Sequence, residues 1–408
     1  MLDRFAQIRR VFSVIGGDSP ALRVFVFRSA KEFRAFADAA NTAGFYQQGL
    51  DRDYIVLYGA SGFTRTAAHE YIHLILDRGD PLPRWFEEGT AEVYSNLDFQ
   101  GRQMVVGAPV PQYLALLASA PWLDAAQLRN ARNWQTADSK LSSMFYAESW
   151  ALAHMLNLAP GWRDRMPAFA ETLSRGRDDP LAFREAFGKT MEQAVAELPG
   201  YLPNLRGVTL DAPPPSAPAP VEVSAVAPLE AAMARAELAL AVDHAAQARG
   251  YFLDAAQAAP RTPGAEAALG LLALAENRRE QARSRLERAI EMGSRDAAIY
   301  FQLAMLERDA GQRPRSNQLL RRAIALNPNL GEAQFLLGSE AMDRQDWETA
   351  VGYLQAAARA LPRKSYIWTA LALTQTRLGL EMDARISAAR AYHTAQNEQE
   401  QQAAEALR

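Results

Sequence analysis

The sequence predicts two folded parts of different class, a mixed α+β amino-terminal domain at residues 1–202 and an all-α array of helical repeats at residues 229–398. The length of 408 residues suits two or three domains of ordinary size. A proline-rich stretch interrupts the chain near its middle, and a period of 34 residues runs through the part that follows it. We therefore expect a linker at residues 203–228 and a short carboxy-terminal tail at residues 399–408.

The composition excludes several classes of function. The chain has 44 basic and 47 acidic side chains, a balance that argues against a nucleic-acid partner bound through charge. No apolar run approaches the roughly 18–20 residues of a transmembrane segment. Cysteine is absent, so disulfides and thiolate metal ligands are excluded, and only five histidines remain for imidazole chemistry. The start MLDRFAQIRR carries no secretion signal, and the compartment stays open: cytosolic, or periplasmic or secreted if a leader is missing from this chain.

Hydrophobic periodicity and turn residues predict the elements of the first domain in order. They are a helix at 2–15, a strand at 23–28, a helix at 31–39, and strands at 43–48 and 53–59 joined by a turn at 49–52. Two helices and then a mainly helical lobe follow, up to about residue 202. Those two helices carry the residues that predict chemistry.

The first of the two helices contains the pattern His-Glu-Tyr-Ile-His at residues 69–73. Side chains four apart lie on one face of a helix, so His69 and His73 can hold one metal ion while Glu70 lies beside it. Two imidazoles do not complete a catalytic zinc site, which needs a third protein ligand and an open position. A histidine six residues after His73 is one known solution, but that position is Gly79. A glutamate on the following helix is the other.

The following helix reads Trp-Phe-Glu-Glu-Gly-Thr-Ala-Glu at residues 85–92. Glu88 and Glu92 lie four apart on one face, which would let Glu88 bind the metal while Glu92 accepts a hydrogen bond from an imidazole N–H. Glu87 points about 100° away around the helix, so it is the weaker candidate.

These motifs resemble the gluzincin metallopeptidases, most closely the peptidase MA-like group, which often carries tetratricopeptide repeats. The segments HEYIH and PLPRWFEEGTAEVYS carry the resemblance, with weaker likenesses in PALRVFVFRSAKEFRAF and SSMFYAESWALAHML. It implies a zincin-like fold, Zn²⁺ as cofactor and a peptide or protein substrate. The site residues that it implies are the zinc ligands His69, His73 and Glu88, the general base Glu70, and Glu92 beside a ligand. Glu92 remains open as the third ligand, because its spacing from His73 is also used by the aminopeptidase branch.

The resemblance implies three further features. Tyr146 resembles a tyrosine that hydrogen-bonds the oxyanion in this superfamily, with packing against Trp150 in the core as the alternative. The strand at 43–48 is the candidate edge strand for an extended peptide. The Gly-x-Met-Glu-Asn segment of aminopeptidases is absent, which favours an endopeptidase. His154, eight residues after Tyr146, is expected to be structural.

The second half repeats itself every 34 residues. A leucine followed by a small residue recurs at Leu269-Gly270, Leu303-Ala304, Leu337-Gly338 and Leu371-Ala372. Small residues at fixed offsets let antiparallel helices approach closely. The pattern resembles the tetratricopeptide repeat in about five units, which implies a solenoid whose concave face takes a protein partner. A helical scaffold that supports or dimerises the first domain is the alternative.

Six prolines in the sixteen positions 213–228 predict an extended, semi-rigid linker between the two parts. Two functions then compete. One is a zinc-dependent peptidase with Glu70 as general base and repeats that recruit protein. The alternative is a catalytically silent, metal-binding repeat scaffold that mediates protein–protein interactions. Glu70 favours the enzyme, because a structural metal site has no need of a base.

Overall fold

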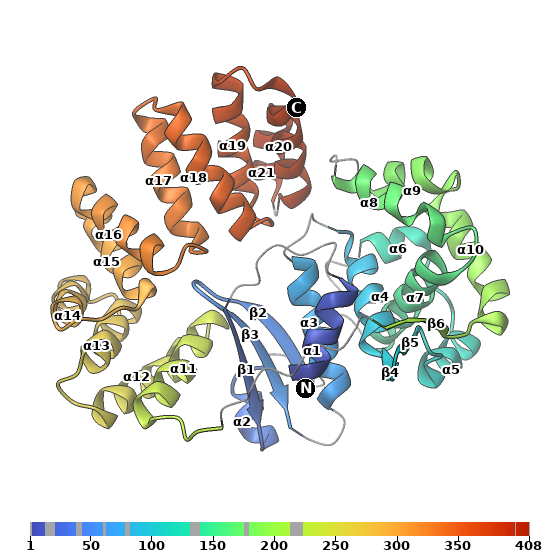
Figure 1. The fold of residues 1–408 in the computed structure, drawn as a ribbon, viewed down its shortest axis with the longest axis horizontal. Helices are drawn as coiled ribbons and strands as arrows, with labels where there is room; N and C mark the ends of the chain where they lie inside the picture. Colours follow the sequence, from blue (N-terminus) through green and yellow to red (C-terminus); the bar gives the residue numbers. More distant parts are fainter. Residues whose placement is uncertain are drawn as a thin grey trace.

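The computed structural model describes residues 2–12, 21–37, 43–59, 63–77, 82–130, 139–174, 179–212, 223–395 and 397–407. Within these ranges a mixed α+β part is followed by an array of paired helices that curves around it (Figure 1). None of the helices in the described ranges is both long enough and apolar enough to cross a membrane.

The first part contains two small sheets and a helical lobe. Its strands are β1 (Leu22–Phe27), β2 (Gly44–Gln48), β3 (Asp53–Tyr58), β4 (Asp98–Gln100), β5 (Gln103–Val106) and β6 (Val208–Asp211). Its helices are α1 (Leu2–Val11), α2 (Ala30–Arg34), α3 (Phe63–Asp77), α4 (Arg84–Ser95), α5 (Pro111–Ser119), α6 (Ala125–Arg129), α7 (Ser139–Leu158), α8 (Met166–Ser174), α9 (Asp179–Phe187) and α10 (Met191–Tyr201). Short 3-10 turns lie at Arg163–Arg165 and Leu202–Asn204.

The three predicted strands lie within one residue of β1, β2 and β3 at each end. The helices predicted at 2–15 and 31–39 are shorter in the structure. The first ends at Val11, and residues 13–15 of the prediction lie outside the described ranges. The second, α2, begins after Ser29, whose hydroxyl accepts a hydrogen bond from the N–H of Glu32, and ends at Arg34. The chain then turns and buries Phe36 in the core.

The first sheet has the strand order β1-β3-β2, with β1 parallel and β2 antiparallel to β3. Successive side chains of a strand point to opposite faces. In β3, Ile55 and Leu57 belong to the core that includes α3, whereas Tyr54 and Val56 belong to a cluster shared with α2 and the first repeats. Burial on both faces explains why β3 is almost wholly apolar.

The second sheet has the order β4-β5-β6 with antiparallel pairing throughout. It was not predicted, because its strands are only three or four residues long. Its last strand moves the boundary of the first part. The linker predicted to begin at residue 203 begins only after Asp211, since β6 still pairs with β5. Residues 213–222, which hold most of the linker prolines, lie outside the described ranges.

The second part consists of helix pairs. They are α11 (Pro228–Ala241) with α12 (Ala245–Ala258), α13 (Pro263–Ala275) with α14 (Arg279–Glu291), α15 (Ala297–Asp309) with α16 (Arg313–Leu326), α17 (Gly331–Asp343) with α18 (Trp347–Ala360), and α19 (Ser365–Arg377) with α20 (Glu381–Thr394). The residues predicted as a tail at 399–408 instead form most of another helix, α21 (Glu398–Glu405), which Asn397 caps and whose Ala404 is buried.

The small residues of the 34-residue pattern lie where paired helices pack. A Cβ at Gly270 would come within 2.5 Å of the Leu286 side chain, and one at Gly338 within 2.8 Å of the Leu354 side chain. Larger side chains would therefore separate the helices of a pair. The prediction of stacked helical hairpins with a 34-residue period is confirmed.

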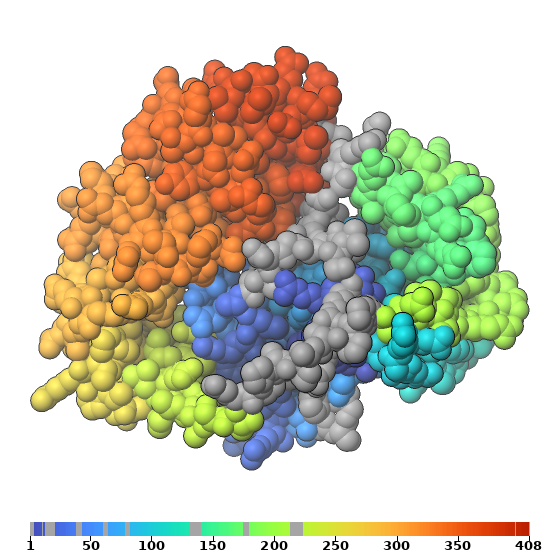
Figure 2. Space-filling view, viewed as in Figure 1, coloured from blue at the N-terminus to red at the C-terminus, as the bar shows by residue number. Residues whose placement is uncertain are grey.

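The helical array lies against the first part along its length, and Figure 2 shows it as a continuous band from yellow-green to red. Phe36 stacks on Tyr251 with ring centroids 5.9 Å apart. The Arg23 guanidinium in β1 pairs with Glu237 in α11 at 3.0 Å. The sequence gives no sign of this packing, because the linker between the two parts predicts only that they are separate.

Candidate metal centre

The two helices that carry the predicted ligands are held at fixed positions by apolar packing. Ile72 and Ile75 place α3 in the same buried cluster as the first sheet, and Tyr71 stacks on Phe5 of α1 with centroids 4.3 Å apart. In α4, the buried indole of Trp85 donates a hydrogen bond to Asp179 over 3.2 Å. Gly89 lies against the backbone of Ser149 in α7 so closely that a Cβ there would be 2.1 Å from its carbonyl oxygen.

Three potential metal ligands converge between α3 and α4. The Nε2 atoms of His69 and His73 are 3.0 Å apart, and Oε2 of Glu88 lies 3.6 Å from the first and 3.3 Å from the second. A zinc ion about 2.0–2.1 Å from each atom of a tetrahedral site would set the ligand atoms about 3.3–3.4 Å apart. These residues are the group with metal-binding geometry among the described histidines and carboxylates. The arrangement fits a zinc ion.

Glu92 lies on the far side of His69 from the three converging atoms. Its Oε1 is 3.4 Å from Nδ1 of His69, which leaves Nε2 of that ring directed at the other ligands. Arg65 donates to Glu92 Oε2 over 2.7 Å, and the hydroxyl of Tyr113 also hydrogen-bonds Glu92. A carboxylate that accepts from the second ring nitrogen fixes the orientation and tautomer of a metal-binding histidine.

Glu70 is buried beside the three ligand atoms without being one of them. The backbone N–H of Tyr46, in β2, hydrogen-bonds its carboxylate. Burial raises the pKa of Glu70 above its ordinary value, against the lowering effect of His69 and His73. Within the described residues, β2 is an edge strand of its sheet. Its contact with Glu70 therefore places the edge strand predicted at 43–48 next to the metal centre.

Tyr146 on α7 also reaches the centre. Burial and the charge of Glu88 raise the pKa of Tyr146 to about 12, so that its hydroxyl remains a hydrogen-bond donor at neutral pH. Tyr146 hydrogen-bonds Arg84, whose Nε is 3.8 Å from Oε1 of Glu88. Trp150, the alternative packing partner of Tyr146, instead has its ring near Tyr113 and His154.

The electrostatics of the centre favour a cation. Burial alone would lower the pKa of His69, but the hydrogen bond to Glu88 and the charges of Glu70 and Glu92 raise it to about 9. Burial likewise opposes the shift of His73, whose pKa is raised by Glu88. The pKa of Glu88 is well below its ordinary value, because the two imidazoles outweigh its burial. The three-residue cluster therefore holds protons that a bound metal would displace.

The remaining candidates take structural positions. Glu87 pairs with Arg363 of the repeat array, in agreement with its weaker candidacy. His154 is buried, with Nδ1 at 2.7 Å from the Tyr201 hydroxyl and Nε2 at 2.8 Å from the Gly107 carbonyl oxygen, as expected for a structural histidine.

Sequence reasoning missed three residues around the centre. Arg65 and Arg84 lie one helical turn before His69 and Glu88, so their spacing could have identified them. Tyr113 comes from α5 and carries no local signal, because its contact with Glu92 depends on the tertiary fold.

No protein-family model matches this chain, and no curated protein matches it. Several solved structures are similar to part of it. The structure of MamA has 17% identity and a TM-score of 0.32, covering 41% of this chain and 91% of that chain. YrrB, described as a TPR protein with an unusual peptide-binding site, has 17% identity and a TM-score of 0.34, covering 43% of this chain and 90% of that chain. A thermophilic TPR protein of Thermus thermophilus has 19% identity and a TM-score of 0.33, covering 43% of this chain and 95% of that chain.

Proposed function

We propose that this chain is a zinc-dependent peptidase whose repeats recruit protein. The observation that carries the proposal is the convergence of His69, His73 and Glu88 at tetrahedral spacing, with the carboxylate of Glu70 buried beside them but not among them. When bound there, zinc would polarise the scissile carbonyl and lower the pKa of a water molecule towards 7. His69, His73 and Glu88 would hold the zinc ion. Glu92 would keep His69 in the required tautomer.

The chain's own groups support the remaining chemistry. Glu70, whose pKa is raised by burial, is suited to take a proton from water and to deliver it to the leaving amine. The Tyr146 hydroxyl and the Arg84 guanidinium are hydrogen-bond donors on the Glu88 side of the centre, where they could stabilise an oxyanion. β2 offers an edge for an extended peptide, with backbone hydrogen bonds giving affinity with loose side-chain preference.

Two variants and a metal analysis test this proposal. The purified protein is expected to hold about one zinc per chain, and His73→Ala to hold none. Glu70→Gln should keep the zinc, since Glu70 is not a ligand, and lose cleavage of a proteome-derived peptide library. A wild-type protein that takes up no zinc from metal-replete buffer would contradict the proposal.

The second candidate is a catalytically silent metal-binding scaffold that mediates protein–protein interactions. The observation that favours this candidate is the array of stacked helical hairpins, because such arrays present extended surfaces to other proteins. A groove between α17, α19 and α21, lined by Asp343, Tyr366 and Glu400 among others, is where such a partner could bind. If neither the wild type nor Glu70→Gln cleaves the peptide library, although both bind zinc, the scaffold would be favoured.

A further inference from the structure

We infer that the repeat array is a structural part of the metal centre, and that Arg363 is a positioning residue for the two helices that carry the ligands. This inference rests on the proposed function only in that the centre must bind a metal ion. Arg363 lies in the turn between α18 and α19, close to the carboxy-terminal end of the array.

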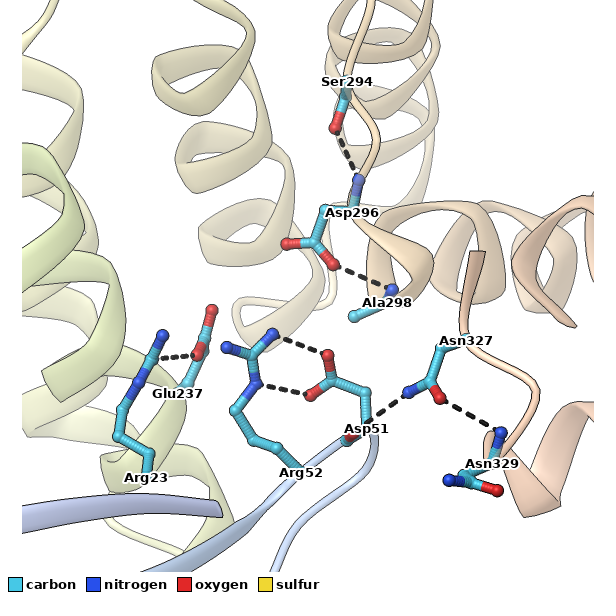
Figure 3. A network of polar contacts seen from close by, with 9 residues as sticks. All are labelled: Arg23, Asp51, Arg52, Glu237, Ser294, Asp296, Ala298, Asn327 and Asn329. Carbon is cyan, nitrogen blue, oxygen red and sulfur yellow. Dashed lines mark hydrogen bonds and ion pairs between the residues drawn. The ribbon is translucent and has the colours of Figure 1, made fainter. Parts of the chain in front are cut away.

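Two of the contacts between the array and the first part come from turns that join one helix pair to the next. In the turn between α16 and α17, the amide of Asn327 donates to the carbonyl oxygen of Asp51 over 3.0 Å. Asp51 also pairs with Arg52 at 2.7 Å, and Asp296, from the turn before α15, lies beside these residues (Figure 3). Leu50 packs against the buried cluster formed by α15 to α17. The turn between β2 and β3 is therefore held by the inter-repeat turn at Asn327 and by packing of Leu50 on α15 to α17.

Arg363 makes the corresponding contact one repeat later, and it reaches the ligand helices. Its Nε lies 2.5 Å from Oδ1 of Asp77, the last residue of α3, and its Nη2 donates to Oε1 of Glu87 in α4. Asp77 is one helical turn after His73, and Glu87 directly precedes Glu88. One guanidinium thus bridges the two helices next to a ligand on each.

The charges at this bridge make Arg363 difficult to replace. The side chains of Asp77 and Glu87 are only 15% and 13% exposed, so removal of the arginine would leave two carboxylates of like sign poorly solvated and close together. The Tyr46 hydroxyl, 3.1 Å from Asp77 Oδ2, is a neutral group and would not replace the lost charge. Repulsion between these carboxylates would separate the ends of α3 and α4.

Separation of the helices would act on the metal centre directly. The 3.3 Å between Nε2 of His73 and Oε2 of Glu88 depends on the distance between α3 and α4, which Arg363 fixes at the adjacent positions. A further consequence is coupling: any partner that shifts the repeats at α18 and α19 would change the geometry of the ligands.

The control for this inference is a second ion pair between the two parts. Arg23 in β1 pairs with Glu237 in α11 at 3.0 Å, and neither of these residues lies on α3 or α4. Arg23→Met therefore weakens the attachment of the array without touching the ligand helices, whereas Arg363→Met removes the bridge itself. Glu87→Gln removes one charge of the bridge with a side chain of the same shape.

The experiment measures zinc affinity by chelator competition, and the visible absorption of the Co²⁺-loaded full-length protein as a signature of ligand geometry. Arg363→Met is expected to lower zinc affinity by about tenfold or more, in the range found for residues that support metal ligands, and to change the Co²⁺ bands. Glu87→Gln should have a smaller effect, because Arg363 keeps its ion pair with Asp77 and no repulsion between carboxylates arises. Their double variant should bind zinc more tightly than Arg363→Met alone, because the repulsion between residues 77 and 87 is then removed. Arg363→Lys, which keeps the charge, should recover part of the loss.

Two outcomes overturn the inference while leaving the proposed function intact. One is a wild type that binds zinc together with an Arg363→Met variant of equal affinity and unchanged Co²⁺ spectrum. The other is an equal loss in Arg23→Met and Arg363→Met, which would assign the effect to docking of the array in general. A wild type that binds no zinc overturns the proposed function and the inference together.

Discussion

The close crossing of α4 and α7 gives the most direct test of how the centre is built. Gly89 follows the ligand Glu88, and a Cβ at residue 89 would lie 2.1 Å from the carbonyl oxygen of Ser149 and 2.7 Å from the Cβ of Ala153. Ordinary contacts of this kind are longer than about 3 Å, so Gly89→Ala requires the helices to move apart by about 1 Å. The obstacle is a buried helix backbone that no rotamer change can relieve.

The cost of that movement is at the upper end of the values for overpacked cores, about 3 kcal/mol of unfolding free energy. The alanine's better helix propensity, about 1 kcal/mol, offsets only part of it. Because Glu88 moves with α4, the zinc affinity of Gly89→Ala should also fall, by about tenfold or more. A shift of the chain at a motif glycine would thus affect stability and metal binding together.

Urea unfolding of the metal-free protein measures the first effect, and chelator competition the second. Gly352→Ala is the matched control, because Gly352 is also in a helix but a Cβ there meets nothing within 4 Å. That variant should gain about 0.5–1 kcal/mol and leave zinc affinity unchanged. If Gly89→Ala unfolds within about 0.5 kcal/mol of wild type and binds zinc equally well, the packing argument for the position of Glu88 is wrong.

Three further predictions concern the metal ligands, a buried carboxyl group and the removal of zinc. Glu88→Gln should abolish zinc binding, whereas Glu92→Gln should weaken it by about 10–100-fold; titration with zinc giving the reverse order would make Glu92 the ligand. Burial raises the pKa of the fully buried Glu148 to about 7, so the folded state keeps a proton that the unfolded state loses, and stability should fall by about 3 kcal/mol as the pH rises from 4.5 to 7. Glu148→Gln should reduce that slope in denaturant titrations at several pH values, and an unchanged slope would assign it to other groups. Removal of zinc present at 100 times its dissociation constant should lower the unfolding free energy by about 2.7 kcal/mol, and a midpoint that chelator leaves unchanged would argue against binding to the folded state.

The parts of the structure that the sequence predicts are those governed by local spacing. His69 and His73 are one helical turn apart, and Glu88 is identified by its place in the next helix, so helix geometry and one tertiary contact are enough to bring them together. The helix pairs of the repeats follow from small residues at a fixed period, because each pair requires the same close packing.

Contacts between distant segments leave no such trace. Arg363 and Glu87 are 276 residues apart, as are Asn327 and Asp51. The composition of a turn such as Leu-Pro-Arg-Lys does not indicate which buried carboxylates it meets. The second sheet was missed for a related reason, since β6 pairs with a strand about a hundred residues earlier and is too short to show a strand pattern of its own.

Arginines are distributed unevenly among the carboxylates of the metal centre. Five acidic side chains surround the α3–α4 crossing: Glu70, Asp77, Glu87, Glu88 and Glu92. Four of them have an arginine within ion-pair distance, which is Arg363 for Asp77 and Glu87, Arg84 for Glu88 and Arg65 for Glu92.

Glu70 is the exception among the described residues, and its pKa is raised by burial. A scaffold that needed only to hold an ion has no need of a buried carboxylate that does not bind the ion, because burial of a charged group is costly. A general base, in contrast, requires a carboxylate whose pKa is not lowered by an adjacent guanidinium. An adjacent guanidinium would lower its pKa and weaken it as a proton acceptor, whereas burial without an arginine moves the pKa towards the working pH. Among these five carboxylates of the described chain, Glu70 therefore lacks an arginine, as the proposed general base requires.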